Sequence, residues 1–334
     1  VPTQEESPIT RKMREFDWSH HPLGPPNTWP QSLRTMVQVM IDSRFEMWLG
    51  WGESLYFFHN DAYAPTLGQK GAWALGAPTE KVWSEIWTGI SPRISSVLQN
   101  GKATWDEKLL LFLERNGYPE ETYHTFSYSP IPNDEGGIGG LLCTVTEVTE
   151  EVIAKRRMTF LRELGTELAK HNTEKELGNA LANFLGSHAH DLPFALLYAF
   201  SPDKKRAHLI SAMGVDSTSI HASPTLNLED PNIVWPATAF LSTDTFSPQL
   251  VELSHTDFSR FGKGPWDQLP RFATVVAVSQ RGQKDAAGFM VAGLNPHRPL
   301  DESYRGFFEL LTGQLAGAWS NVRAYEDAQQ RAQA

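Results

Sequence analysis

Residues 124–152, HTFSYSPIPNDEGGIGGLLCTVTEVTEEV, combine a glycine cluster, the chain's single cysteine and an abrupt end of β character. His124, Phe126 and Tyr128 alternate with smaller polar residues, which is typical of one face of a strand. The glycines lie between two strand-like runs, whereas a dinucleotide-binding loop needs glycines that open a helix. We therefore predict a turn between two antiparallel strands. Cys143 falls in mid-strand with no His or Lys beside it, which predicts a buried, unreactive thiol.

The same pattern extends toward the N-terminus. Five β-like runs occupy residues 45–51, 54–60, 103–115, 120–131 and 136–149, and short helical segments lie between the second and third of them. This order predicts a five-stranded antiparallel sheet with helices on one face. The last run passes straight into a charged helix at 146–172, where Thr146 or Thr149 can serve as the N-cap.

The second half repeats the scheme. It offers an amphipathic helix at 173–190, hairpins at 194–214 and 272–296, and a long terminal helix at 301–334. The predicted fold class is α+β, with two domains that each contain an antiparallel sheet flanked by helices, joined and ended by long helices. The expected boundaries are a disordered tail at 1–15, a first domain at 16–150, a connecting helix at 151–172, a second domain at 173–322, and the start of a coiled coil at 323–334.

Composition narrows the class of protein. The net charge of −10 argues against nucleic acid and against an anionic membrane surface as partners. One cysteine cannot form an internal disulfide or a zinc–thiolate cluster, which suits a reducing cytoplasm. No apolar run approaches the roughly 20 residues of a membrane span. We expect a cytoplasmic protein without nucleic-acid or membrane partners.

At this point the residues resemble known families. The exit GGLLCTVTEVTEEV is similar to the end of PAS domains, and FMVAGLNPHRPLDESYRGFFELLTGQLAGAWSNVRAYEDA is similar to the last strand and helix of GAF domains. More narrowly, DWSHHPLGPPNTWPQSLRTMVQVMIDSRFEMWLGWG, FFHNDAYAPTLGQKGAWALG, VWSEIW and LERNGYPEETYHTFSYSPI resemble the N-terminal input region of bacterial PAS–GAF sensor histidine kinases, often hybrid kinases.

This resemblance implies a sensory module of a two-component system. Neither a phospho-acceptor motif nor an ATP site occurs in the chain, and its first residue is not Met, so we expect a fragment that is not itself an enzyme. The kinase domain would belong to the remainder of the full-length protein. Two alternatives stay open, namely a dimerisation scaffold without ligand and a cryptic enzyme of PAS or GAF fold.

Aromatic residues of the first half suggest a small-ligand pocket. The candidates, which fall on the elements that enclose a PAS cavity, are Trp48, Trp51, Tyr56, Phe58, Trp73, Trp83, Trp87 and Trp105, with Asn60, Asp61, Tyr63 and Thr125 as polar contacts. The alternative is a solid aromatic core without a ligand.

The sequence requires no cofactor. A flavin-adduct photosensor needs a cysteine within a helix, whereas Cys143 is expected on a strand. A bilin needs a thioether cysteine, and neither half of the chain offers one in a suitable place. Haem ligation by His59 or His124 stays open. His188, His190 and Asp191 end a helix and are expected to be solvated rather than to bind a metal.

The terminal helix carries a heptad pattern. Apolar residues step by three and four through Phe308, Leu311, Leu315, Ala318, Val322 and Tyr325. Such a seam packs either on its own sheet or on a partner helix. We expect a parallel homodimer through this seam.

Overall fold

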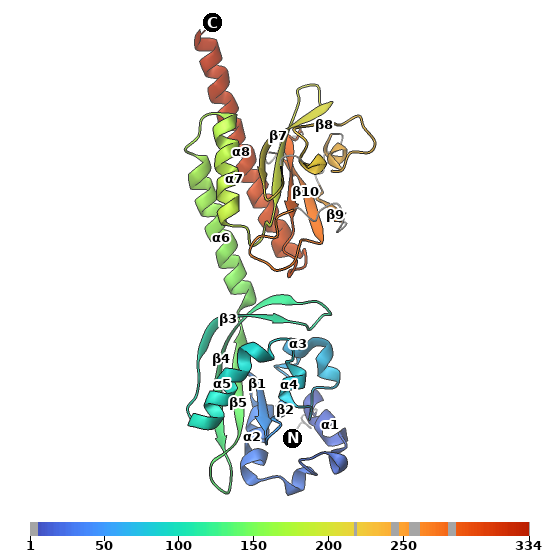
Figure 1. Ribbon diagram of the computed structural model, residues 1–334, viewed down its shortest axis with the longest axis vertical. Helices are drawn as coiled ribbons and strands as arrows, with labels where there is room; N and C mark the ends of the chain where they lie inside the picture. Colours follow the sequence, from blue (N-terminus) through green and yellow to red (C-terminus); the bar gives the residue numbers. More distant parts are fainter. Residues whose placement is uncertain (1–5, 217–218, 242–246, 254–260, 280–284, 334) are drawn as a thin grey trace, which may run out of the picture. The chain divides into compact units, whose positions relative to one another are not determined.

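The computed structural model describes residues 6–216, 219–241, 247–253, 261–279 and 285–333. The chain forms two compact units, Val1–Ile153 and Ala154–Ala334 (Figure 1). Each unit contains one antiparallel sheet with helices, so the predicted α+β class is confirmed. Within the described residues, no helix combines the length and the apolar character that a membrane crossing needs.

The sheet of the first unit has the strand order β2-β1-β5-β4-β3. Its strands are β1 (Glu46–Trp51), β2 (Tyr56–His59), β3 (Asp106–Leu113), β4 (Glu120–Pro132) and β5 (Ile138–Glu147). Cys143 on β5 lies opposite Trp48 of β1 and Tyr128 of β4. The predicted five-stranded antiparallel sheet is therefore confirmed. Gly136 and Gly137 lie at the turn before β5, and Gly139 and Gly140 lie within the strand.

Three short helices and one longer helix cover one face of the first unit's sheet. One face of the sheet forms a core with α3 (Ala64–Leu67), η3 (Gly68–Ala72), α4 (Thr79–Val82) and α5 (Trp87–Asn100). The rings of Trp48, Phe57, Trp83 and Tyr128 are buried in this core. Helix α5 ends where Gly101 takes a left-handed conformation, which glycine adopts without a steric penalty.

The N-terminal segment covers the other face. It comprises α1 (Pro8–Glu15), η1 (Trp18–His20), η2 (Pro26–Thr28) and α2 (Gln31–Asp42). Trp18 stacks on Phe58 with ring centroids 5.6 Å apart, and a separate aromatic core forms there.

The expected disordered tail at 1–15 differs from what the structure shows for its described part. The hydroxyl of Ser7 caps α1 by accepting from the Thr10 amide, and Pro8 occupies the first turn. Ile9 is buried, and its amide donates to Asp61 Oδ1 at 2.9 Å.

In the second unit the sheet has the order β8-β7-β6-β11-β10-β9. The strands are β6 (Ala195–Phe200), β7 (Arg206–Met213), β8 (Thr225–Asn227), β9 (Gln249–Glu252), β10 (Phe272–Val278) and β11 (Gly288–Gly293), and two 3₁₀ turns, η4 (Ile220–Ala222) and η5 (Ala237–Phe240), lie on the connections. The two predicted hairpins are β6–β7 and β10–β11.

Three helices cover one face of this sheet. Helix α6 (Thr149–Leu168) begins in the first unit and continues into the second, where it packs with α7 (Glu174–Ser187) and α8 (Glu302–Gln333) (Figure 1). The shared core contains side chains from all three helices and from β6, β10 and β11.

The heptad seam of α8 has a different partner from the one expected. Phe308, Leu311, Leu315 and Val322 are at most 2% exposed and belong to the second unit's own core, with Ala318 packed at its edge. Tyr325 is 44% exposed. The assignment of this seam to a partner helix was therefore wrong, because the α6, α7 and sheet side chains already fill the grooves beside it.

Candidate functional site

A small cavity lies between the first unit's sheet and its helices. Its volume is about 30 Å³, and the residues that line it come from β1, α3, α4, α5, β3, β4 and β5, among them Trp48, Tyr63, Thr66, Trp83, His124, Tyr128 and Cys143. Binding pockets for drug-sized ligands occupy roughly 300–1,000 Å³, so this cavity is too small for a flavin or a haem. It offers room for about two water molecules.

His124 is the most polar group in the cavity wall. It lies on β4 and is 2% exposed. Burial, with a smaller contribution from Arg115, lowers the pKa of His124 to about 4, although the carboxylate of Glu147 opposes this. His124 Nε2 lies 4.0 Å from Glu147 Oε2. The imidazole is therefore neutral at neutral pH.

The thiol of Cys143 borders the same space. It is 2% exposed, and burial raises the pKa of the thiol well above its usual value. The predicted burial of Cys143 is confirmed, and a neutral buried thiol is a poor nucleophile.

The predicted pocket residues divide into three groups. Trp48, Tyr63 and Trp83 line the cavity, and Trp87 packs at the edge of the surrounding core. Trp51, Tyr56 and Phe58 belong to the aromatic core on the opposite face of the sheet. Trp73 and Trp105 are 44% and 69% exposed. The last two groups correct the predicted pocket. Residues at odd spacing along a strand point to opposite faces, which places Trp51 away from the cavity, and Trp73 and Trp105 lie outside the strands on the surface.

The predicted polar contacts have structural roles. The Asn60 side chain bonds the backbone at Met40, Ser43, Phe45 and Met47 and the amide of Tyr63. Asp61 accepts from the Ile9 amide, and Thr125 Oγ1 accepts from the Lys108 amide at 3.1 Å. Asn60 and Asp61 therefore tie loops and the N-terminal segment to the sheet rather than gripping a ligand.

Sequence reasoning missed Thr66 and Tyr128 as cavity residues, and it considered His124 only as a candidate haem ligand. A signal for two of them was present, because His124 and Tyr128 share one face of β4 with Phe126. What the sequence lacked was a reason to assign that face to the cavity.

The cavity wall adjoins the start of α6. Arg115 donates to Glu147 through Nη1 at 2.7 Å and Nη2 at 3.1 Å, and to Glu120 through Nε at 2.9 Å. Thr149, the first residue of α6, donates from Oγ1 to Glu147 Oε1 at 2.8 Å and accepts from the Tyr123 amide. Burial opposes ionisation of Glu147, but Arg115 and Thr149 together lower the pKa of its carboxyl. One carboxylate thus links the cavity wall to the helix.

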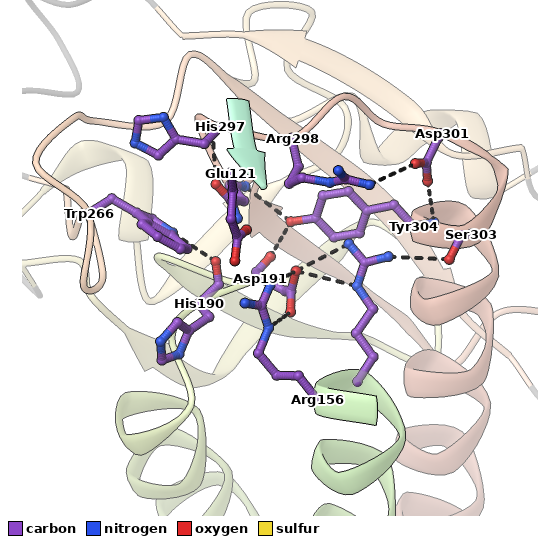
Figure 2. Close-up of polar contacts among 12 residues, drawn as sticks. Glu121, Arg156, His190, Asp191, Trp266, His297, Arg298, Asp301, Ser303 and Tyr304 are labelled. Carbon is purple, nitrogen blue, oxygen red and sulfur yellow. Dashed lines mark hydrogen bonds and ion pairs between the residues drawn. The ribbon is translucent and has the colours of Figure 1, made fainter. Parts of the chain in front are cut away.

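A second polar cluster surrounds Asp191 in the second unit (Figure 2). Arg156 Nε donates to Asp191 Oδ2 and Nη2 to Oδ1, both at 2.9 Å, and Arg157 donates to Oδ1 at 3.1 and 3.3 Å. The guanidinium of Arg157 lies 4.1 Å from the ring centre of Tyr304, whose hydroxyl donates to the Asp191 carbonyl. Asp191 therefore joins α6 to the first turn of α8.

This cluster corrects the expectation of a solvated helix end, because Asp191 is 5% exposed. His188 stacks on Phe184, and the carbonyl of His190 accepts from Trp266 Nε1. Among the described residues, no group of three or more His, Cys, Asp or Glu side chains is arranged to hold a metal ion.

Part of the first unit matches a known protein family. Residues 53–153 match the family model of the PAS fold. The PAS fold provides the antiparallel sheet and the helix-covered face that enclose the cavity. The chain matches none of the curated proteins with which it was compared.

Solved structures of low identity are also similar. The GAF domain of a phosphoenolpyruvate-protein phosphotransferase from Acinetobacter shares 15% identity, covers 51% of this chain and 97% of its own, and gives a TM-score of 0.36. The corresponding GAF domain from Coxiella burnetii shares 13% identity over 52% and 98%, with a TM-score of 0.38. A sensory box sensor histidine kinase from Vibrio cholerae shares 15% identity over 36% and 94%, with a TM-score of 0.26.

Proposed function

We propose that this chain is the sensory input module of a two-component histidine kinase in the cytoplasm. The PAS-fold unit receives a signal or a small ligand, and α6 conveys the change to a second unit of GAF type. Helix α8 then passes the change to a kinase domain in the longer protein. The chain itself performs no catalytic step in this proposal.

The observation that carries the proposal is the continuity of α6. Its first residue, Thr149, is bonded to the carboxylate beside the PAS-fold cavity, and about two turns later Arg156 and Arg157 bind Asp191. Tyr304 of α8 bonds the carbonyl of the same Asp191. A helix held at its first residue and again about two turns later is a physical route by which one site can bias another.

A scaffold is the second candidate, and the small cavity favours it. A PAS-fold core with only about 30 Å³ of free space is nearly solid. In that case the chain would dimerise and space its neighbours without perceiving a ligand.

Breaking α6 tests the relay. We expect Lys155→Pro, in this chain fused in frame through α8 to a histidine-kinase transmitter, to change the autophosphorylation rate by roughly fivefold or more. Lys155 is exposed, and proline within a helix removes a backbone hydrogen bond and kinks it. Lys155→Ala is the matched control and should leave the rate unchanged. A wild-type rate from Lys155→Pro, in protein whose two units remain folded by near-UV circular dichroism, would contradict the relay and favour the scaffold.

The proposal includes a parallel homodimer, formed by α8 beyond Val322. Tyr325, Ala328 and Ala332 lie on one face of this part of the helix and are exposed. A helix end without packing is marginally stable in water, so a partner helix would stabilise it.

Sedimentation equilibrium of the whole chain should give twice the 37.4 kDa protomer mass. We expect Ala328→Glu to weaken the dimer by about tenfold or more, because it places two unpaired charges in the interface. Gln330→Glu adds the same charge on the opposite face and should change little. A protomer mass at every concentration would refute the dimer.

A further inference from the structure

Four buried side chains with polar atoms line the PAS-fold cavity. They are Tyr63, Thr66, His124 and Tyr128, which are 4%, 2%, 2% and 3% exposed. Both ring nitrogens of His124 are buried without a hydrogen-bond partner within the described part of the protein. The four side chains come from α3 and its N-terminal end and from β4, and they line the same space.

The two unsatisfied ring nitrogens of His124, beside three hydroxyl groups that line the same space, call for an occupant. Buried polar atoms in folded proteins are almost always hydrogen-bonded, to protein or to a bound molecule, and each one left unpaired costs about 1–3 kcal/mol. A neutral imidazole offers one donor and one acceptor, and each hydroxyl offers both. The occupant must therefore donate as well as accept hydrogen bonds.

The surroundings select a neutral occupant. His124 stays uncharged because it is buried. Arg115, the cation that acts on His124, already binds both oxygens of Glu147 and one of Glu120. An ion in the cavity would lose its hydration without gaining a counter-ion, which is strongly unfavourable.

We propose that the PAS-fold cavity binds one neutral molecule of about two or three non-hydrogen atoms, a small amide or alcohol that contacts His124 in place of buried water. This inference rests on the sensory function proposed above and specifies its ligand class. A ligand at His124 would lie beside Glu147, which bonds the first residue of α6. Binding of the ligand would therefore alter the surroundings of Glu147 at the start of α6.

The test is a titration of the whole chain, labelled with ¹⁵N in histidine and tryptophan, with formamide. We expect saturable shifts of the His124 ring nitrogens and of the Trp48 and Trp83 indole signals. A ligand of three non-hydrogen atoms binds no tighter than about 1 mM. Formate has the same non-hydrogen skeleton but carries a charge, and it should bind at least about tenfold more weakly.

Two variants locate the site. His124→Phe should abolish the formamide response, and Tyr128→Phe should weaken it severalfold while the indole signals of Trp48 and Trp83 confirm the fold. Tyr198→Phe is the control, because the Tyr198 hydroxyl donates to the Ser223 carbonyl in the second unit. It should bind formamide as the wild type does.

Three results would overturn the inference. They are a linear response to formamide without saturation, equal binding of formate, or wild-type binding by folded His124→Phe. The first would show that the cavity holds water alone or is closed, the second that it does not select a neutral ligand, and the third that formamide binds away from His124. The relay function would be unaffected by these results, since the Lys155→Pro fusion tests it separately.

Discussion

Replacement of Asp191 by Asn should lower the free energy of unfolding of the second unit by about 3–5 kcal/mol. The side chains of Arg157 and Asp191 are only 5% and 6% exposed, and Asp191 is the carboxylate that the structure places against both Arg157 and Arg156. Asparagine keeps the shape and part of the hydrogen bonding but removes the charge. A buried guanidinium without its counter-ion is the main source of the expected loss.

Scanning calorimetry of the whole chain would measure this effect. For a unit of this size each kcal/mol corresponds to roughly 2–4 °C, so its transition should move down by about 6–20 °C. Glu252→Gln is the control, because its ion pair with Arg271 is exposed and is worth about 0–1 kcal/mol. Adding Arg157→Met to Asp191→Asn should recover part of the loss. A shift of the Asp191→Asn transition no larger than that of Glu252→Gln would contradict the role of the buried charge.

His124 should make the stability of the PAS-fold unit depend on pH. Its pKa is about 4 in the folded unit and about 6.5 in the unfolded chain. Between these values the unfolded chain binds a proton that the folded unit does not. The free energy of unfolding should therefore fall as the pH falls from about 6.5 to 4, by up to about 3 kcal/mol in total.

Urea unfolding at several pH values, followed by the tryptophan fluorescence of the first unit, would measure this slope. Two other groups contribute in the same direction. Burial lowers the pKa of His59, and Arg115 lowers that of Glu147. The informative quantity is therefore the difference in the free energy of unfolding between wild type and His124→Phe, which should change by up to about 3 kcal/mol between about pH 6.5 and pH 4 and stay constant outside this range. Parallel curves of the free energy of unfolding against pH for the two proteins would show that folding does not shift the pKa of His124, and would contradict the prediction.

Much of the fold was predictable because the signals are local. Strand alternation identified all five strands of the PAS-fold unit, and the predicted ends of β4 and β5 agree with the structure to within two residues. Strand β3 begins at Asp106, three residues later than predicted, and the register shifts between Asp106 and Leu109, where Lys108 has a positive φ of 51°. A bulge of this kind has no clear signature in a single sequence.

The candidate site was predicted less well because it depends on which face of a strand meets which layer. Trp48 and Trp51 are three positions apart, so they necessarily point to opposite faces of β1. The sequence shows this opposition but not that the N-terminal segment builds a second aromatic core around Trp51. From the sequence alone, the aromatic residues of β1 and β2 on both faces of the sheet were therefore assigned to the cavity lining.

The heptad seam of α8 shows a related ambiguity. Steps of three and four residues describe a stripe that must be buried, but they do not say whether the covering side chains come from the same protomer. Here Leu311 and Leu315 contact their own unit's core. The part of the helix that is free to meet a partner is the run beyond Val322, where the described side chains are exposed or half-buried.

The N-terminal segment, residues 8–42, wraps over one face of the first sheet. This wrap has a practical consequence for anyone who shortens the protein for expression. The family match begins at residue 53, so a truncation there would delete β1, which pairs with both β2 and β5, along with Trp18 and Trp29. Phe58 and Ile131 would then face solvent, and the unpaired edge of β5 would invite aggregation. A soluble PAS-fold fragment should therefore start before Ser7, which caps the first helix of the wrap.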